Sequence, residues 1–288
     1  MKKFKIVCLL VVSAAAAACG SFLNPAPPTD SPTSTVAIYS AIGASDANGV
    51  GSSSVCLPYA TCPDGKGYVQ EIARRLQAAG KTVTLQNLGV PGAVMSPAIQ
   101  TMGNQLNRGI AINFMQDEAP FVRTDSTLVT IFAGGNDANT LGSALKAGMG
   151  GSNPTAWANQ QIASWGTDMA SLVSAVKARA PKARIVILNL PNLAALPYAA
   201  GYTLAEKQVL QQIAVGLNAG INATASQGAI VVDMMCDSRL YSTSIFSSDG
   251  FHPNDAGYQL FADLAYAVAP TTALTTSPKS SCSYMSVY

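Results

Sequence analysis

The sequence predicts an α/β fold in which helices cover both faces of a parallel sheet. Short apolar segments alternate along the chain with longer segments of helical spacing. The short segments are apolar at almost every position, as strands buried on both faces are. Apolar residues make up 49% of the 288 residues and charged residues only 11%, a composition that excludes an intrinsically disordered chain.

Five segments have the length and the apolar, β-branched composition of buried strands. They are Thr35–Ile42, Thr82–Leu88, Thr127–Ala133, Arg184–Leu190 and Ala229–Met234. Residues that interrupt regular structure follow several of them, such as Gly134 after the third and Pro191 after the fourth. We therefore expect a sheet of five parallel strands.

Four segments have the spacing of helices that cover such a sheet. They are Tyr68–Ala79, Trp157–Ala180, Leu204–Ala225 and Asp255–Ala267. Two further stretches, Ala93–Asp125 and the glycine-rich Asn139–Asn153, do not fit the alternation of strand and helix. Both follow strand ends, so they either form the walls of a substrate cleft or are surface excursions without a role.

The N-terminus reads as a secretory signal, which we assign to residues 1–18. Lys2, Lys3 and Lys5 precede an apolar run that ends at Ala18. The run is shorter than the roughly 20 residues that a membrane-spanning helix needs. Ala16-Ala17-Ala18-Cys19 resembles the bacterial lipoprotein box, in which the cysteine becomes lipid-modified. Ordinary cleavage after an Ala-x-Ala sequence is the alternative.

The remaining chain divides into a tether, one domain and a tail. Residues 19–34 are rich in Pro, Ser and Thr and are expected to link the lipid anchor to the domain. The domain spans residues 35–269 and the C-terminal tail spans 270–288. We expect an exported protein anchored to a bacterial membrane, the outer one if the cell has two, and otherwise a periplasmic or secreted protein.

Charge and cysteine content agree with an exported protein that does not bind nucleic acid. Without residues 1–18 the chain has 14 Lys and Arg against 15 Asp and Glu, a net charge of −1. An even number of cysteines in an oxidising compartment suggests two disulfides among Cys56, Cys62, Cys236 and Cys282. Proximity favours Cys56–Cys62 and leaves Cys236–Cys282, one of three possible pairings. One histidine and no C-x-x-C argue against a metal site.

Polar residues at the expected strand ends form the parts of an acyl-transfer site. Ser45 follows the first strand, Gly92 the second and Asn136 the third, while Asp249 and His252 lie before the last helix. Ligands bind outside the carboxyl ends of parallel strands. A serine nucleophile needs a base, which only His252 can supply, and Asp249 would orient that imidazole. The Ser45 N–H, the Gly92 N–H and the Asn136 amide would stabilise an oxyanion.

These segments, in this order, resemble the conserved blocks of the SGNH/GDSL hydrolases. The blocks are Gly-Ala-Ser-Asp around Ser45, Asn-Leu-Gly-Val-Pro-Gly up to Gly92, Gly-Gly-Asn-Asp around Asn136, and Asp-Gly-Phe-His-Pro-Asn from Asp249 to Asn254. The resemblance covers about Thr35 to Ala269. It implies a flavodoxin-like three-layer α/β/α sandwich and an esterase or lipase without metal or organic cofactor.

The first block departs from the family pattern on both sides of the serine. Ala44 stands where the family has Asp, and Asp46 where it has Leu. Neither position is the nucleophile, so the assignment of Ser45 holds, and we interpret Asp46 as a residue that stabilises the loop.

The function expected from these residues is serine ester hydrolysis through an acyl-enzyme. The substrate would be a lipid ester, a short acyl ester or an acetylated glycan. Two alternatives remain: a polysaccharide O-acetylesterase of the same family, and a catalytically silent surface-binding module.

Overall fold

Five parallel strands form the centre of the molecule in the order β2-β1-β3-β4-β5. The computed structural model describes residues 35–60, 62–269 and 277–288. The strands are β1 (Val36–Gly43), β2 (Thr82–Asn87), β3 (Leu128–Phe132), β4 (Arg184–Leu188) and β5 (Ile230–Val232). The five predicted strands are therefore confirmed. The strand order reverses between β1 and β3, and open α/β sheets bind their ligands outside such a point.

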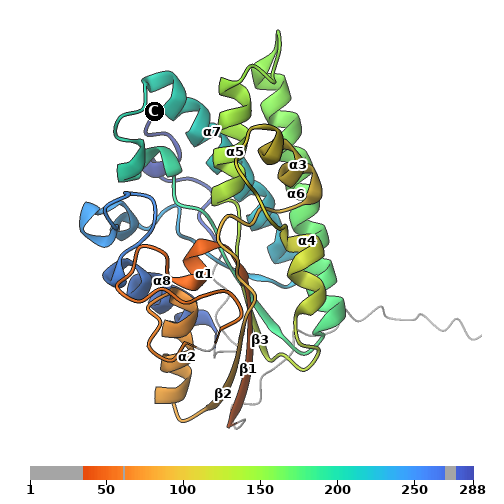
Figure 1. The fold of residues 1–288 in the computed structure, drawn as a ribbon, viewed down its shortest axis with the longest axis vertical. Helices are drawn as coiled ribbons and strands as arrows, with labels where there is room; N and C mark the ends of the chain where they lie inside the picture. Colours follow the sequence, from red (N-terminus) through yellow and green to blue (C-terminus); the bar gives the residue numbers. More distant parts are fainter. Residues whose placement is uncertain (1–34, 61, 270–276) are drawn as a thin grey trace, which may run out of the picture.

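Helices cover both faces of the sheet, as Figure 1 shows. One face carries α2 (Tyr68–Ala78) and α8 (Asp255–Val268), which pack against each other. The other carries α3 (Pro97–Gln105), α4 (Phe114–Asp117), α5 (Gly135–Lys146), α6 (Pro154–Arg179) and α7 (Leu204–Ala223). The short α1 (Ser45–Asn48) lies at the end of β1. The predicted α/β/α sandwich is confirmed.

Short 3₁₀ segments complete the connections among the described residues. They are η1 (Ala119–Phe121), η2 (Leu193–Ala195), η3 (Pro197–Ala199), η4 (Thr224–Gln227), η5 (Ser238–Tyr241), η6 (Thr243–Ile245) and η7 (Ser283–Met285).

Side-chain caps explain where the long helices begin. The Thr203 hydroxyl accepts a hydrogen bond from the Glu206 N–H while the Glu206 carboxylate accepts one from the Thr203 N–H, a capping box that starts α7. The Asn153 side chain caps α6, whose first residue is Pro154. This cap extends α6 N-terminal to the predicted start at Trp157.

The glycine-rich stretch Asn139–Asn153, which did not fit the expected alternation of strand and helix, is partly helical. Helix α5 runs to Lys146 and packs against α7. Its residues Ala138, Leu141 and Ala144 are fully buried and recur at every third position, so burial of one face offsets the poor helix propensity of the glycine and polar residues between them.

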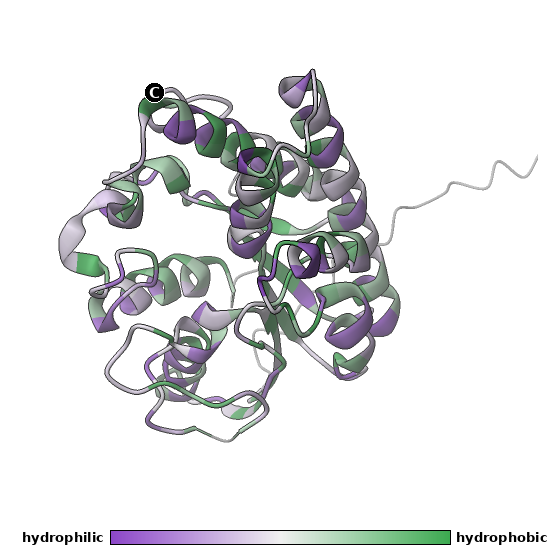
Figure 2. Ribbon diagram, turned by 45° about the horizontal axis from the view of Figure 1, so that its top comes forward, coloured by the Kyte–Doolittle hydropathy of each residue, from purple (hydrophilic) through white to green (hydrophobic). Residues whose placement is uncertain are grey.

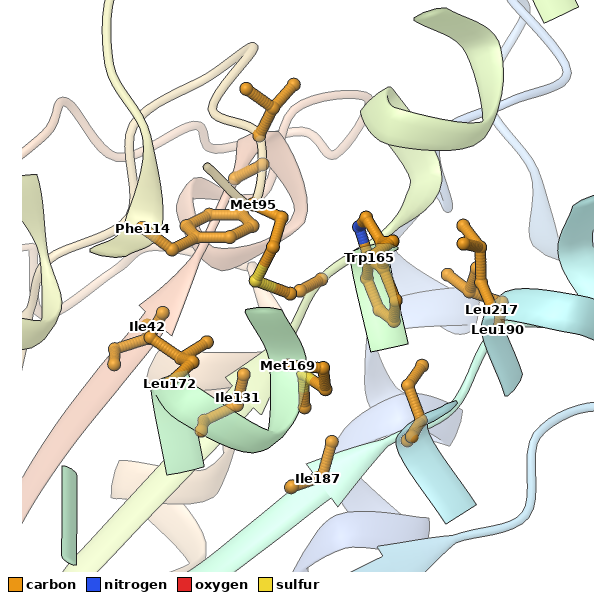
Figure 3. Close-up of a cluster of buried hydrophobic side chains, with 14 of the residues drawn as sticks. Ile42, Met95, Phe114, Ile131, Trp165, Met169, Leu172, Ile187, Leu190 and Leu217 are labelled. Carbon is orange, nitrogen blue, oxygen red and sulfur yellow. The ribbon is translucent and has the colours of Figure 1, made fainter. Parts of the chain in front are cut away.

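The larger core lies between the sheet and the face that carries α5, α6 and α7. Figure 3 shows Ile131 and Ile187 of adjacent strands beneath Trp165 and Met169 of α6. Each of these side chains is less than 5% exposed, and burial of such a side chain contributes about 1.5–3 kcal/mol. In Figure 2 the helices carry hydrophobic residues on the side that faces the sheet and hydrophilic residues on the outer side.

Two disulfides join the pairs predicted from proximity, Cys56–Cys62 and Cys236–Cys282. The second ties residues 277–288 to the domain, where the Tyr284 ring stacks on Tyr241 with centroids 3.9 Å apart. Disulfides of this kind fit an exported protein.

The predictions for the N-terminus concern residues outside the described ranges. They are the signal at 1–18, the lipid site Cys19 and the tether at 19–34. Within residues 35–60, 62–269 and 277–288, none of the helices combines the length and apolar character needed to cross a membrane.

Candidate active site

Ser45 lies directly beyond the carboxyl end of β1, as the first residue of α1. It is only 6% exposed. The Asn48 amide one turn later donates to the Gly89 carbonyl oxygen over 2.7 Å and so ties α1 to the segment that follows β2. The position of the serine is therefore fixed by both neighbouring strands.

The loop before α8 brings Asp249 and His252 to this serine. The His252 Nε2 atom lies 2.8 Å from the Ser45 Oγ, and its Nδ1 atom lies 2.6 Å from Asp249 Oδ2. The other carboxylate oxygen, Asp249 Oδ1, accepts the backbone N–H groups of Phe251 and His252, each over 2.9 Å. These bonds fold the loop back on itself and hold the imidazole between serine and carboxylate.

The environment of Asp249 keeps this carboxyl group ionised. Partial burial raises its pKa, but hydrogen bonds from the His252 ring, from the His252 and Phe251 N–H groups and from Ser247 outweigh that effect and lower the pKa to about 2. A carboxylate that stays charged can hold the Nδ1 proton of His252, which leaves Nε2 as the acceptor that faces Ser45.

Gly51 allows His252 to pack against the loop that follows α1. A side chain at this position would place its Cβ 2.8 Å from the His252 Cβ and 2.7 Å from the Pro253 carbonyl oxygen. The backbone φ of +92° also lies where L-residues are strained. The sequence analysis did not identify Gly51, because nothing local in the sequence indicates that His252 packs on it.

The predicted oxyanion donors Gly92 and Asn136 lie on neighbouring segments. The Asn136 amide, in the first turn of α5, donates to the Ala93 carbonyl oxygen over 3.0 Å. Gly92 has φ +84° and open space around the position of a Cβ. Among the described residues, the N–H groups of Gly92 and Ser45 have no hydrogen-bond acceptor. Both donors therefore remain available to a ligand.

The buried carboxyl groups of Glu118 and Asp137 and the partly buried one of Asp46 support the loops around the site. The Glu118 Oε2 atom accepts the Gly43 N–H over 2.9 Å, and the Asp137 Oδ1 atom accepts the Met95 N–H over 2.8 Å. Asp46 accepts a longer bond of 3.4 Å from the Tyr258 hydroxyl, in keeping with its interpretation as a loop residue. Burial raises the pKa of Asp46, raises that of Asp137 to about 6, and raises that of Glu118 well above its usual value.

Glu118 was not identified from the sequence. No local signal marks it, because Gln116 and Asp117 directly precede Glu118 and such polar residues are mostly exposed. Within the described residues, no cluster of His, Cys, Asp and Glu could hold a metal ion.

Comparisons with solved structures find the same fold in ester hydrolases. A phospholipase A1 from Streptomyces albidoflavus NA297 is 22% identical with a TM-score of 0.53, and covers 82% of this chain and 100% of its own. An extracellular lipase from Streptomyces rimosus is 20% identical with a TM-score of 0.55, at 81% and 99% coverage. An acetyl xylan esterase from Geobacillus stearothermophilus is 15% identical with a TM-score of 0.53, at 84% and 100% coverage.

Comparison with protein families gives a direct assignment. A search of curated proteins finds no match to this chain. Residues 41–260, which contain Ser45, Gly92, Asn136, Asp249 and His252, match the GDSL-like lipase/acylhydrolase family. The resemblance inferred from the sequence is thereby confirmed, and the chain belongs to the GDSL-like lipase/acylhydrolase family.

Proposed function

We propose that this chain is a serine ester hydrolase that works through an acyl-enzyme on Ser45. The observation that carries the proposal is the continuous hydrogen-bonded chain from Ser45 Oγ through His252 to Asp249, with distances of 2.8 and 2.6 Å. A serine hydroxyl within hydrogen-bond reach of an oriented base is the arrangement that nucleophilic catalysis requires.

In the first half of the reaction, Ser45 Oγ attacks the ester carbonyl carbon as its proton passes to His252 Nε2. The tetrahedral oxyanion accepts hydrogen bonds from the Ser45 N–H, the Gly92 N–H and the Asn136 amide, and each such donor contributes about 3–4 kcal/mol. The intermediate then collapses, and the leaving alcohol takes the proton from His252 Nε2.

The second half releases the acyl group. A water molecule attacks the acyl carbon and gives one proton to His252 Nε2. The bond to Ser45 Oγ breaks, Ser45 recovers its proton from His252, and the carboxylic acid leaves. Asp249 keeps its charge throughout and stabilises the imidazolium form of His252 in both halves.

The test is hydrolysis of p-nitrophenyl esters by the parent and by Ser45→Ala and His252→Ala. Loss of a nucleophile or base typically lowers turnover on the order of 10⁶-fold. Ser174→Ala is a matched control, because its hydroxyl lies on the exposed side of α6, where it donates to the Ala170 carbonyl oxygen and accepts from the Gln227 amide. Labelling of the parent, but not of Ser45→Ala, by a fluorophosphonate would show that the serine is activated.

Two results would contradict the proposal. Activity that survives in Ser45→Ala would exclude the acyl-enzyme. A folded parent that neither hydrolyses esters nor reacts with fluorophosphonate would favour the silent binding module instead.

We also propose that the chain is exported and lipid-anchored through Cys19. The basic and apolar character of residues 1–18 and the Ala-Ala-Ala-Cys sequence before Gly20 support this. Globomycin, which blocks lipoprotein signal cleavage, should cause an uncleaved form to accumulate. Cys19→Ala should release the protein into the soluble fraction, whereas an unchanged membrane fraction in Cys19→Ala would exclude this anchor.

A further inference from the structure

A cavity of about 790 Å³ lies among α5, α6, α7 and the segment after η3. Tyr198 lines it and donates a hydrogen bond of 3.2 Å to Asn139 on α5. The Tyr198 ring lies 4.9 Å from Phe251, and the Phe251 ring lies 5.0 Å from His252, both measured between centroids. Two aromatic rings therefore connect the wall of the cavity to the imidazole of the active site.

Helix α5 connects the same cavity to the oxyanion side of the site. Asn136 lies in the first turn of α5, and Gly142, six residues further on, lines the cavity. Six residues correspond to about 9 Å along a helix axis. A group bound beside Asn136 that extends along α5 would therefore reach the cavity if it were longer than an acetyl or butyryl group.

The lining of the cavity combines apolar side chains from three helices with polar ones such as Arg108, Asn139 and Ser143, and its rim is charged. Ala158 and Leu210 are buried at 2% and 4% exposure, and Val209 and Leu145 line the cavity beside them. The rim carries the ion pair between Lys146 and Glu206, whose Nζ and Oε1 atoms are 2.9 Å apart. The apolar side chains, contributed by α5, α6 and α7, give an acyl chain a surface on which its methylene groups leave water.

We propose that this cavity binds the acyl chain of the ester, so that the enzyme prefers medium- and long-chain fatty acyl esters to acetyl esters. The proposal rests on the proposed function of Ser45. The volume lies within the range of about 300–1,000 Å³ that small-molecule sites have. Each methylene buried in such a site strengthens binding about fourfold. A lauroyl chain therefore gains affinity from the cavity, whereas an acetyl group is too short to reach it.

Gly142 offers a way to fill the cavity. It lines the cavity, and no atom comes within 4 Å of the position that a Cβ would take. Gly142→Trp places an indole in the cavity without a backbone clash. Ala205→Trp fills it from α7, at an exposed position, and serves if the first variant does not fold. Ser174→Trp, on the exposed side of α6, is the matched control for a bulky substitution on a helix.

The experiment measures kcat/KM for p-nitrophenyl acetate, butyrate and laurate, which differ only in the acyl chain. We expect the parent to favour laurate. The filling variants should lower the laurate-to-butyrate ratio about tenfold or more, the equivalent of two buried methylenes at fourfold each. Ser174→Trp should keep the parental ratio.

Three outcomes would overturn the inference. The first is a laurate-to-butyrate ratio that neither filling variant changes. The second is a change confined to a series of acetate esters with longer alcohols, which would place the alcohol in the cavity. The third is a parent that prefers acetate. Fluorophosphonate labelling of Ser45 separates these results from a failure of the proposed function, in which labelling and hydrolysis are both absent.

Discussion

Replacing the buried Glu118 by glutamine is expected to make the protein more stable at neutral pH. The Glu118 side chain is fully buried, and its Oε1 atom has no hydrogen-bond partner among the described residues. Burial raises its pKa well above the usual 4.5 in spite of hydrogen bonds from the Gly43 and Val90 N–H groups. Glutamine keeps an acceptor for the Gly43 N–H and carries no ionisable group.

The sign of the pH dependence follows from the raised pKa. The folded state holds the Glu118 proton more tightly than the unfolded state, so stability is greatest below about pH 4.5 and falls as pH rises toward the folded pKa. Each unit by which the pKa is raised costs about 1.4 kcal/mol above that pKa. The free energy of unfolding of the parent should therefore fall relative to that of Glu118→Gln as the pH rises from 4 to 8.

Glu118→Leu measures the hydrogen bond itself. Leucine leaves the Gly43 N–H buried without an acceptor, which costs about 1–3 kcal/mol of stability. The Val90 N–H still has an acceptor in this variant, because it donates to the Gly43 carbonyl oxygen over 3.3 Å. Because Gly43 lies two residues before Ser45, we also expect kcat to fall in this variant and to be retained in Glu118→Gln.

The assay is urea unfolding followed by circular dichroism at several pH values with the disulfides intact. Glu206→Gln is the control, because hydrogen bonds from Lys146 and Thr203 lower the pKa of Glu206 to about 2, so the folded state keeps this carboxylate ionised from pH 4 to pH 8. A stability difference between parent and Glu118→Gln that does not vary from pH 4 to pH 8 would refute the reasoning.

Three further predictions concern the loop of His252 and the C-terminal disulfide. Asp249→Asn should lower kcat on the order of 10⁴-fold with little change in KM, because the amide no longer fixes the imidazole. Gly51→Ala should cost about 1–2 kcal/mol in free energy of unfolding through backbone strain, more through contact with His252, and should lower kcat. Removing the Cys236–Cys282 bond, which closes a 46-residue separation, should cost about 4 kcal/mol. Steady-state kinetics test the first two, and urea unfolding tests the last two.

Matched variants make these predictions specific. Asp263→Asn changes an exposed carboxylate on α8 and should keep the parental kcat. Gly201→Ala adds a methyl group in open space and should keep the parental stability. If Asp249→Asn keeps the parental kcat, the bond from Asp249 to His252 does not orient the imidazole. If the unfolding midpoint is the same with and without the Cys236–Cys282 bond, that bond does not stabilise the fold.

The strands and the place of the candidate site residues at the edge of the sheet could be predicted because their signals are local. Each strand is a short apolar run, and parallel strands end at one edge of the sheet. Ser45 and Asn136 each follow such a run directly, so their proximity follows from the strand order. The short separation of Asp249 and His252 likewise predicts the loop that is closed by the hydrogen bonds between them.

Other features depend on contacts between distant parts of the chain. Glu118 accepts a hydrogen bond from Gly43, which lies 75 positions earlier in the chain. Gly51 packs against His252, near the other end of the domain. Helix α5 was obscured by its glycine and polar residues, because its stability comes from packing on α7 rather than from propensity. The cavity beside α5 arises from three helices and the segment after η3, and no single segment of the sequence indicates its depth.

The hydrogen bond between Ser45 and His252 joins residues 207 positions apart. Closing so long a loop is costly in chain entropy, and the contact can form only once strands and helices between the two residues have assembled. A chain still emerging from the ribosome therefore carries its serine without a base. Under the proposed mechanism, ester hydrolysis begins only when the segment before α8 has docked, so turnover would report that folding is complete.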